Sequence, residues 1–98
     1  MAYTITQYTR KQASRLGVTV RRSTNPKKKL DVFKRDQRTG NTRKVASVGA
    51  TGYGDYPTFI QTQGQTVANR HRKHYKQRHE KDRHVRGSAG YYADKLLW

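Results

Sequence analysis

Residues 29–36, KLDVFKRD, carry the clearest alternation of apolar and polar positions in the chain. In an extended strand, successive side chains point to opposite faces of the sheet. Leu30 and Val32 therefore share one face, and Asp31 and Phe33 share the other. This pattern predicts a strand with one buried side.

A second alternating run, TRKVASVGA over 42–50, follows the turn residues QRTGN over 37–41. Two such runs around a short turn that contains Gly indicate an antiparallel β-hairpin. A hairpin alone is marginally stable in water, so it needs a third strand or a helix beside it. VTVRRS over 18–23 also alternates and is the candidate third strand.

Three segments have the period and the end signals of helices. QYTRKQASRL can begin after a Thr6 cap and end at Gly17, although its apolar stripe is thin. We expect a long basic helix over 66–86 that is closed by Gly87. Ser88 can cap a last short helix with an apolar stripe of Tyr92, Leu96 and Leu97. We interpret GATGYGDYP, before the long helix, as a glycine-rich corner.

These elements predict a small α+β fold. We expect a two- or three-stranded antiparallel sheet packed by the long basic helix and the short C-terminal helix. Residues 1–22 are interpreted as an N-terminal basic arm, and residues 23–98 as a single domain. The expected core residues are Leu30, Val32, Val45, Val48, Tyr53, Tyr56, Tyr75, Leu96, Leu97 and Trp98.

Acidic side chains in this scheme have structural roles. Asp55 is expected to accept hydrogen bonds within the glycine-rich corner. Arg78 and Asp82 are four residues apart, so they are expected to pair along the long helix and tie it to that corner.

The composition predicts that the fold is only marginally stable without a partner. The chain has 98 residues, a formal net charge of +16 and 32% hydrophobic residues. Low hydrophobicity with high net charge approaches the range of disordered proteins. Seven Tyr, two Phe and one Trp offset this, because each aromatic side chain buries a large area. A polyanionic partner would therefore help to order the chain.

Several classes of protein are disfavoured by the same composition. The chain has no Cys, so we expect neither a disulfide nor a thiolate metal site. It has no apolar run near 18 residues, and the first residues have no signal-peptide pattern, so no membrane role is expected. A cytosolic, nuclear or intravirion location fits these features.

Charge is the strongest functional signal. Twenty-two Lys and Arg residues face six acids, which favours nucleic acid as the partner. On the predicted long helix, one face carries mostly cations and a single acid, Glu80. We expect phosphate contacts from Arg72, Lys73, Lys76 and Arg83, helped by Lys27, Lys28, Lys29, Arg21 and Arg22. Such contacts act by counterion release and are blind to sequence.

The four histidines do not indicate a metal site. On a helical wheel, His79 lies about 140° from His74 and His84 about a further 140° around, so the rings do not converge on one ion, and no H-E-x-x-H spacing is present. The six acids are scattered, and GATGYGDYP is not followed by the Gly-Lys-Ser/Thr of a phosphate-binding loop. We therefore expect no metal, no cofactor and no catalytic residue. A metal-dependent nuclease using Asp55 or Asp82 is the least favoured alternative.

Four segments in this order carry a resemblance: NPKKKLDVFKRD, VASVGATGYGDYPTFI, HYKQRHEKDR and GSAGYYADKLLW. Over about residues 24–98 the chain resembles a family of short basic proteins of giant nucleocytoplasmic DNA viruses. The sharpest matches are GYGDYP, Tyr75 with Arg78 and His79, and the final LLW. The resemblance implies a viral protein packaged in the particle, with no assigned reaction and no catalytic residues to transfer.

The sequence thus leaves two main hypotheses. The first is a non-enzymatic, sequence-nonspecific nucleic-acid-binding protein of the virion that helps to package a genome, with DNA a better candidate than RNA. The second is a minor capsid or cement protein whose partners are acidic capsid proteins. Either would be found in the virion, and in the host cytoplasm or nucleus during infection.

Overall fold

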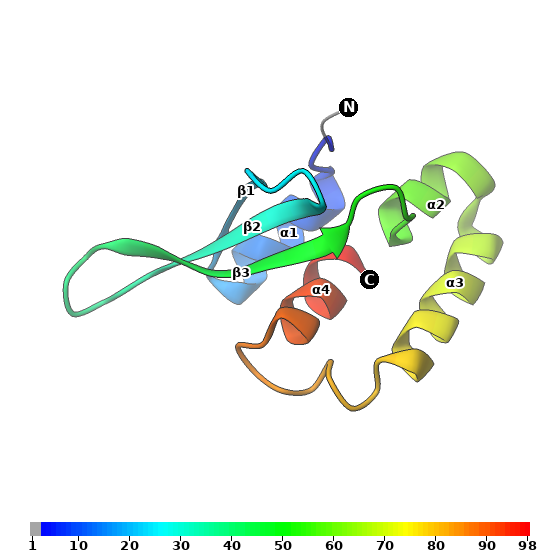
Figure 1. Cartoon of the computed structure of the whole chain (residues 1–98). Coiled ribbons are helices and arrows are strands. Elements are labelled where there is room, and N and C mark those ends of the chain that lie inside the picture. The colour runs from blue at the N-terminus through cyan, green and yellow to red at the C-terminus, as the bar shows by residue number, and fades with distance from the viewer. Residues whose placement is uncertain (1–2) are drawn as a thin grey trace.

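A three-stranded antiparallel sheet in the order β1-β2-β3 forms one layer of the protein (Figure 1). The structure is a computed structural model that describes residues 3–98. The α+β fold class is confirmed. Its elements are α1 (Gln7–Leu16), β1 (Thr19–Arg22), β2 (Lys28–Arg35), β3 (Thr42–Ala50), α2 (Tyr56–Gln63), α3 (Gln65–Arg78) and α4 (Ala89–Leu97).

The register of the sheet follows the alternation in the sequence. Leu30 pairs with Val48 and Val32 pairs with Ala46, which puts the buried side chains on the face toward the helices. Asp31 lies on the opposite face and pairs with Ser47. A β-bulge between Val32 and Phe33 shifts the register beyond this point. The expected hairpin and third strand are therefore confirmed.

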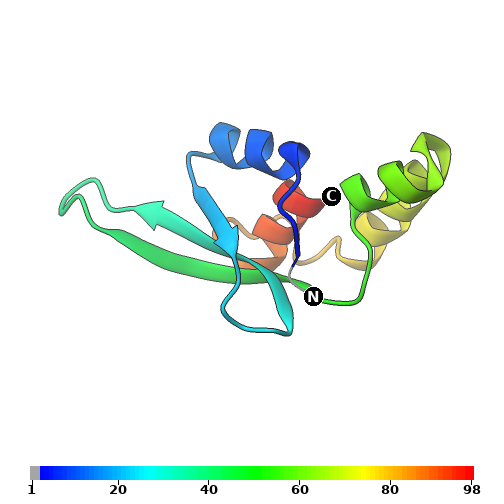
Figure 2. The ribbon, with the colours of Figure 1, turned by 90° about the horizontal axis from the view of Figure 1, so that it is seen from above.

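Helices α1 and α4 cover the buried face of the sheet (Figure 2). Thr6 caps α1 and Gly17 ends it in the left-handed conformation, as the sequence predicts. The fully buried Thr9 hydroxyl donates a hydrogen bond to the Leu96 carbonyl oxygen at 2.8 Å. Val20 of β1 also lies in the core. Segment 7–22 thus shares the core of the expected domain instead of standing apart as an arm.

The long helix expected over 66–86 is shorter in the structure. Helix α3 ends at Arg78, and His79 is its C-cap. The chain then turns back through residues 79–88, where the Asp82 and Arg83 N–H groups both donate to the His79 carbonyl oxygen. A continuous helix would carry this segment away from α4. The turns instead bring Arg83 to α4, where its Nη1 atom lies 3.8 Å from an Asp94 carboxylate oxygen.

The glycine-rich corner leads into a helix that the sequence analysis did not predict. Asp55 caps α2 by accepting a hydrogen bond from the Thr58 N–H at 3.0 Å, and Pro57 lies in the first turn. Helices α2 and α3 pack against each other beside the sheet (Figure 1). Helix α3 contacts α4 and the residue after it through an ion pair and a pair of stacked rings. The helices on the sheet are therefore α1 and α4.

Most of the expected core is buried, with one clear exception. Leu30, Val32, Val48, Leu96 and Leu97 are at most 1% exposed and form one cluster, and Tyr56 is buried in α2 outside that cluster. Val45, Tyr75 and Trp98 are partly buried. Tyr53 is 76% exposed, so its assignment to the core is wrong.

Phe59, which is partly buried, is the aromatic residue that packs against the glycine-rich corner. The corner backbone at Gly54 approaches the Phe59 ring so closely that an added Cβ would clash with it. The Phe59 ring thus packs against the corner, and the Tyr53 side chain is left pointing outward.

Candidate nucleic-acid interface

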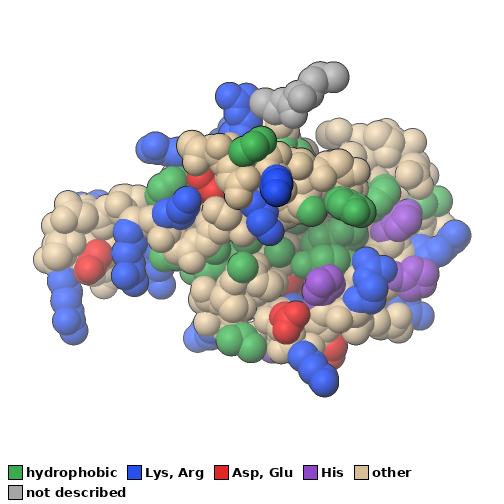
Figure 3. Space-filling model, viewed as in Figure 1, with side chains coloured by type: hydrophobic (Ala, Val, Ile, Leu, Met, Phe, Trp, Pro, Cys, Tyr) green, Lys and Arg blue, Asp and Glu red, His purple; other side chains and the backbone are tan. Residues whose placement is uncertain are grey.

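Residues 34–44, which we call the hairpin arm, project beyond the helices (Figure 1). Every residue of the arm is exposed. Five cations, Lys34, Arg35, Arg38, Arg43 and Lys44, stand against one acid, Asp36. Figure 3 shows their blue side chains around the arm at the left. The arm is therefore a two-stranded ribbon with an almost entirely positive surface.

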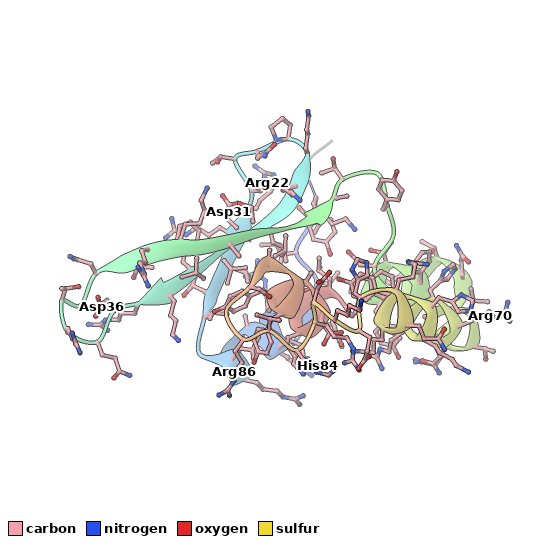
Figure 4. The ribbon with its side chains drawn as sticks, turned by 60° about the horizontal axis from the view of Figure 1, so that its bottom comes forward. Arg22, Asp31, Asp36, Arg70, His84 and Arg86 are labelled. Atoms are coloured by element: carbon pink, nitrogen blue, oxygen red, sulfur yellow. The ribbon has the colours of Figure 1, made fainter. Side chains whose placement is uncertain are left out.

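Backbone hydrogen bonds close the tip of the arm. The Asp36 N–H donates to the Asn41 carbonyl oxygen at 2.7 Å, and the Gly40 N–H donates to the Asp36 carbonyl oxygen at 2.7 Å. The Asp36 carboxylate accepts the Arg38 N–H at 2.8 Å. Asp36 lies at the outer end of the arm in Figure 4, and Arg70 lies on the opposite side of the molecule. The single acid of the arm thus has a local structural role in the turn.

The two faces of the arm both carry cations. Lys34 pairs across the strands with Arg43, so these two side chains share the face toward the helices. Arg35 follows Lys34 and therefore points to the opposite face. A ribbon charged on both faces can contact two rows of phosphates at once.

Shallow hollows meet at the base of the arm. Two of them, of about 410 and 390 Å³, are both lined by Lys34, Gly87 and Tyr92. Arg86 lines the first hollow, and Arg43 lines the second. Lys34 thus stands between Arg43 of the arm and Arg86 of the segment 79–88, where the two hollows adjoin.

The cations expected to bind phosphate on α3 are largely engaged within the protein. Arg72 stacks its guanidinium 3.4 Å from the centre of the Tyr56 ring, and its Nε donates to the Trp98 main-chain oxygen at 2.7 Å. Lys76 forms an ion pair with Asp94 at 2.8 Å. These contacts hold α3 against α2 and α4, which corrects the expectation of a solvent-facing basic stripe.

Arg83 is also engaged. Its side chain is 2.9 Å from a Glu80 carboxylate oxygen and 3.8 Å from Asp94. Hydrogen bonds from His84 and Arg83 hold the pKa of the Glu80 carboxyl below its usual value. Lys73 is the member of the expected set that is exposed and has no carboxylate within 4.0 Å among residues 3–98. Of the four cations expected on this face, Lys73 is thus the one left to solvent.

Lys29 is buried and serves the fold. Its Nζ atom lies 3.0 Å from an Asp55 carboxylate oxygen, and it also donates to the Tyr53 carbonyl oxygen. Its assignment to phosphate binding is therefore corrected. Lys27 and Lys28 are exposed at the start of β2.

Arg21 and Arg22 lie on the edge strand β1 and are both exposed. The Arg21 guanidinium sits 5.4 Å from the Phe33 ring centre. Asp31, on the same outer face of the sheet, accepts the Ser23 and Ser47 hydroxyls, each at 2.7 Å. Burial by itself would raise the pKa of the Asp31 carboxyl, but these hydrogen bonds and the Thr24 N–H lower it.

The expected pair of Arg78 and Asp82 is not formed. Arg78 has no carboxylate within 4.0 Å among residues 3–98, and Asp82 lies 3.9 Å from the His79 ring instead. The reason is that α3 ends at Arg78, so the helical spacing between the two residues is lost. Burial, and then the Asp94 charge, raise the pKa of the nearby Tyr75 hydroxyl to about 12.

The surface carries many more cations than acids. Asp31, Asp55 and Asp94 are buried, and five of the 22 Lys and Arg side chains lie within 4.0 Å of a carboxylate in the part of the chain that is described. The other cations of this part face solvent or neutral groups. Within residues 3–98, no three His, Cys, Asp or Glu side chains gather where they could hold a metal ion.

Sequence reasoning missed the hairpin arm as a functional element. Its signal was nevertheless present, because the apolar alternation of β2 stops at Phe33 and begins again at Val45. None of the residues between them has an apolar side chain that could be buried, and five of them are cations. A hairpin whose outer half lacks a core face is expected to project into solvent.

Comparison with known proteins gives no relative for this chain. No protein-family model matches it, and neither a curated protein nor a solved structure does. The resemblance to proteins of giant nucleocytoplasmic DNA viruses therefore stays a hypothesis. No helix within residues 3–98 has both the length and the apolar character to cross a bilayer.

Proposed function

We propose that this protein binds nucleic acid without sequence preference and without catalysis, and that the hairpin arm makes the main contacts. The supporting observation is the exposed arm, in which five cations surround a single acid that is used in its own turn. A two-stranded β-ribbon fits the major groove of duplex DNA. The arm would therefore enter a groove and contact phosphates on both sides.

The base of the arm extends this contact surface. Lys34 and Arg43 of the arm line adjoining hollows with Arg86, so a phosphate backbone leaving the groove would meet one further positive charge beside these two. Arg21, Arg22, Lys27 and Lys28 are exposed elsewhere on the sheet and would add attraction at longer range. Contacts of this kind release condensed counterions whatever the base sequence.

Binding across a salt series tests this proposal. Fluorescence anisotropy with labelled duplexes of unrelated sequences should give similar affinities at each salt concentration. With about five phosphate contacts, the logarithm of the affinity should fall by about 4 to 5 for each tenfold rise in salt. Salt-independent binding, or strong preference for one duplex, would contradict the proposal.

We also propose that the protein acts inside a virus particle, where it would help to package the genome, with DNA favoured over RNA. Support for this step comes from the resemblance of residues 24–98, and the net charge of +16 fits a genome-bound protein. High-salt extraction of purified particles tests it. A genome-bound protein should leave together with the nucleic acid and not with the shell.

A minor capsid protein is the second candidate, because the ring of Tyr53 is 76% exposed beside the partly buried Trp98. An apolar surface there would suit a capsid partner. In the extraction experiment, a capsid protein should stay with the shell after the genome has been removed.

A further inference from the structure

A hollow of about 430 Å³ is lined by elements that lie on the side of the molecule away from the hairpin arm (Figure 1). It forms where the end of β3, the corner around Tyr53, α3 and the last turn of α4 meet. Its volume falls within the range of about 300 to 1,000 Å³ for small-ligand pockets. Figure 3 shows hydrophobic side chains gathered between the sheet and α3, with histidines at their border.

Six of the 14 residues that line this hollow carry aromatic rings. The Tyr75 and Trp98 rings are stacked, with centroids 4.4 Å apart and an interplanar angle of 9°. Phe59 and His71 form a second stacked pair, with centroids 3.8 Å apart and the same interplanar angle of 9°. Tyr53 stands at the rim with its ring exposed. These rings come from four segments of the chain and leave flat apolar surface inside the hollow.

A buried hydrogen bond and a buried ion pair fix the corner that carries Tyr53. The buried Lys29 donates to the Tyr53 carbonyl oxygen, and its ion pair with Asp55 holds the next turn. Asp55 is fully occupied, because it also accepts the Tyr3 hydroxyl at 2.8 Å and the Thr58 N–H at 3.0 Å. The one carboxylate that lines the hollow is thus neutralised and turned inward.

The mouth of the hollow is positive. The exposed Arg78 lines it and has no carboxylate within 4.0 Å among residues 3–98. His79 lies beside it and packs its ring against Tyr75, with centroids 4.4 Å apart. A ligand that suits this site is therefore an aromatic ring that carries an anionic group.

We propose that this hollow takes one unstacked base of a single-stranded nucleic acid, with an adjoining phosphate held by Arg78. The inference rests on the proposed function, because the hairpin arm supplies the general attraction to nucleic acid. Base stacking on aromatic side chains tolerates any base, since every base has a π-face. A duplex keeps its bases paired and cannot use the hollow, so single strands gain a contact that duplexes lack.

Trp98 gives a direct readout because it is the only tryptophan of the chain. Its fluorescence can be followed with three probes: a short oligodeoxythymidine, a DNA duplex, and inorganic polyphosphate, which has charge but no bases. The oligodeoxythymidine should quench Trp98, while the duplex and polyphosphate should bind at low salt without quenching. Binding of all three with no quenching would overturn the inference and leave the proposed function intact. If none binds, both fail.

Variants of Tyr53 give the second measurement, because an exposed side chain is dispensable for folding. Tyr53→Ala should weaken binding of the oligodeoxythymidine about 5- to 100-fold, in line with the loss of one stacking contact. Binding of the duplex should not change. Tyr53→Phe keeps the ring and should behave like the wild type.

Val85→Ala is the matched control, since Val85 is, among residues 3–98, the other large hydrophobic residue that is clearly exposed, at 56%, and it does not line the hollow. Equal affinities of Tyr53→Ala, Val85→Ala and the wild type for the single strand would overturn the inference. A parallel loss of single-strand and duplex affinity in Tyr53→Ala would do the same.

Discussion

Lys29 and Asp55 form a buried ion pair that joins the start of β2 to the cap of α2. Their charged atoms are 3.0 Å apart, and the side chains are 6% and 1% exposed. Asp55 also caps the helix, so the pair fixes the position of the whole α2–α3 unit relative to the sheet. A residue that sequence alone places among the phosphate-binding lysines thus belongs to the framework.

Replacing Lys29 tests this role. Lys29→Met should lower the free energy of unfolding by about 3–5 kcal/mol, because the Asp55 charge would remain buried without its partner. Urea denaturation of the variant measures the loss. Lys28→Met is the control, and its exposed side chain should change stability by less than about 0.5 kcal/mol. Similar stabilities of the two variants would contradict the framework role.

Lys76 gives a parallel test on α3. Its partner Asp94 is fully buried, and one Asp94 oxygen has no hydrogen bond among the described residues. Lys76→Met should therefore cost about 1–3 kcal/mol of stability, through loss of a charged hydrogen bond. The exposed Lys73 on the same helix is the control, and Lys73→Met should leave stability nearly unchanged.

DNA binding by Lys76→Met separates a structural role of Lys76 from a role in phosphate binding. Lys76→Met should leave the salt dependence of DNA binding unaltered when it is measured well below its melting temperature. If Lys76→Met instead reduced the salt slope by about 1, as the loss of one phosphate contact would, Lys76 would leave Asp94 and bind phosphate in the complex.

Thr9 tests whether the first helix is part of the folded unit. Thr9→Val keeps the shape of the side chain but leaves the Leu96 carbonyl oxygen without its buried partner. The variant should be about 1–3 kcal/mol less stable to thermal unfolding. Thr4→Val, at an exposed position, is the control. If Thr9→Val were as stable as Thr4→Val, the segment before β1 would act as a detachable arm.

Asp31 predicts a specific dependence on pH. Because its pKa is lowered in the folded protein, the ionised carboxyl stabilises the fold above its unfolded pKa near 3.9. This contribution is lost as the pH falls through the folded pKa. Asp31→Asn should therefore be less stable than the wild type at pH 6, and the difference should shrink below about pH 4.

Chemical denaturation at several pH values measures this effect. Asp82→Asn, at an exposed position, should follow the wild-type profile throughout. A constant difference between Asp31→Asn and the wild type down to pH 2 would show that the carboxyl charge has no part in it.

Local patterns in the sequence were enough to predict much of the fold. Period-two alternation located β2 and β3, and the caps Thr6 and Ser88 marked the starts of α1 and α4. These signals depend on residues next to each other in the chain. The α2 helix had a comparable signal, because Asp55 precedes Tyr56-Pro57, but the nearby glycines favoured an interpretation as an irregular corner.

Contacts between distant segments could not be predicted in this way. Whether Lys76 faces solvent or Asp94 depends on how α4 folds back against α3, and these residues are 18 apart in the chain. The end of α3 at Arg78 likewise depends on the contact of the following turns with α4. The phosphate-binding set drawn from helical spacing alone therefore mixed exposed cations with cations that hold the protein together.

Charge-matched variants measured across a salt series test the central claim most directly. One variant carries Lys34→Gln, Arg35→Gln and Arg43→Gln in the hairpin arm, and the other carries Arg10→Gln, Lys11→Gln and Arg15→Gln on the exposed side of α1. Both lose three charges. The hairpin-arm variant should reduce the salt slope of duplex DNA binding by about 2 to 3, and the α1 variant by less than about 1. Equal slopes for the two variants would contradict the account, because binding would then follow net charge and not the hairpin arm.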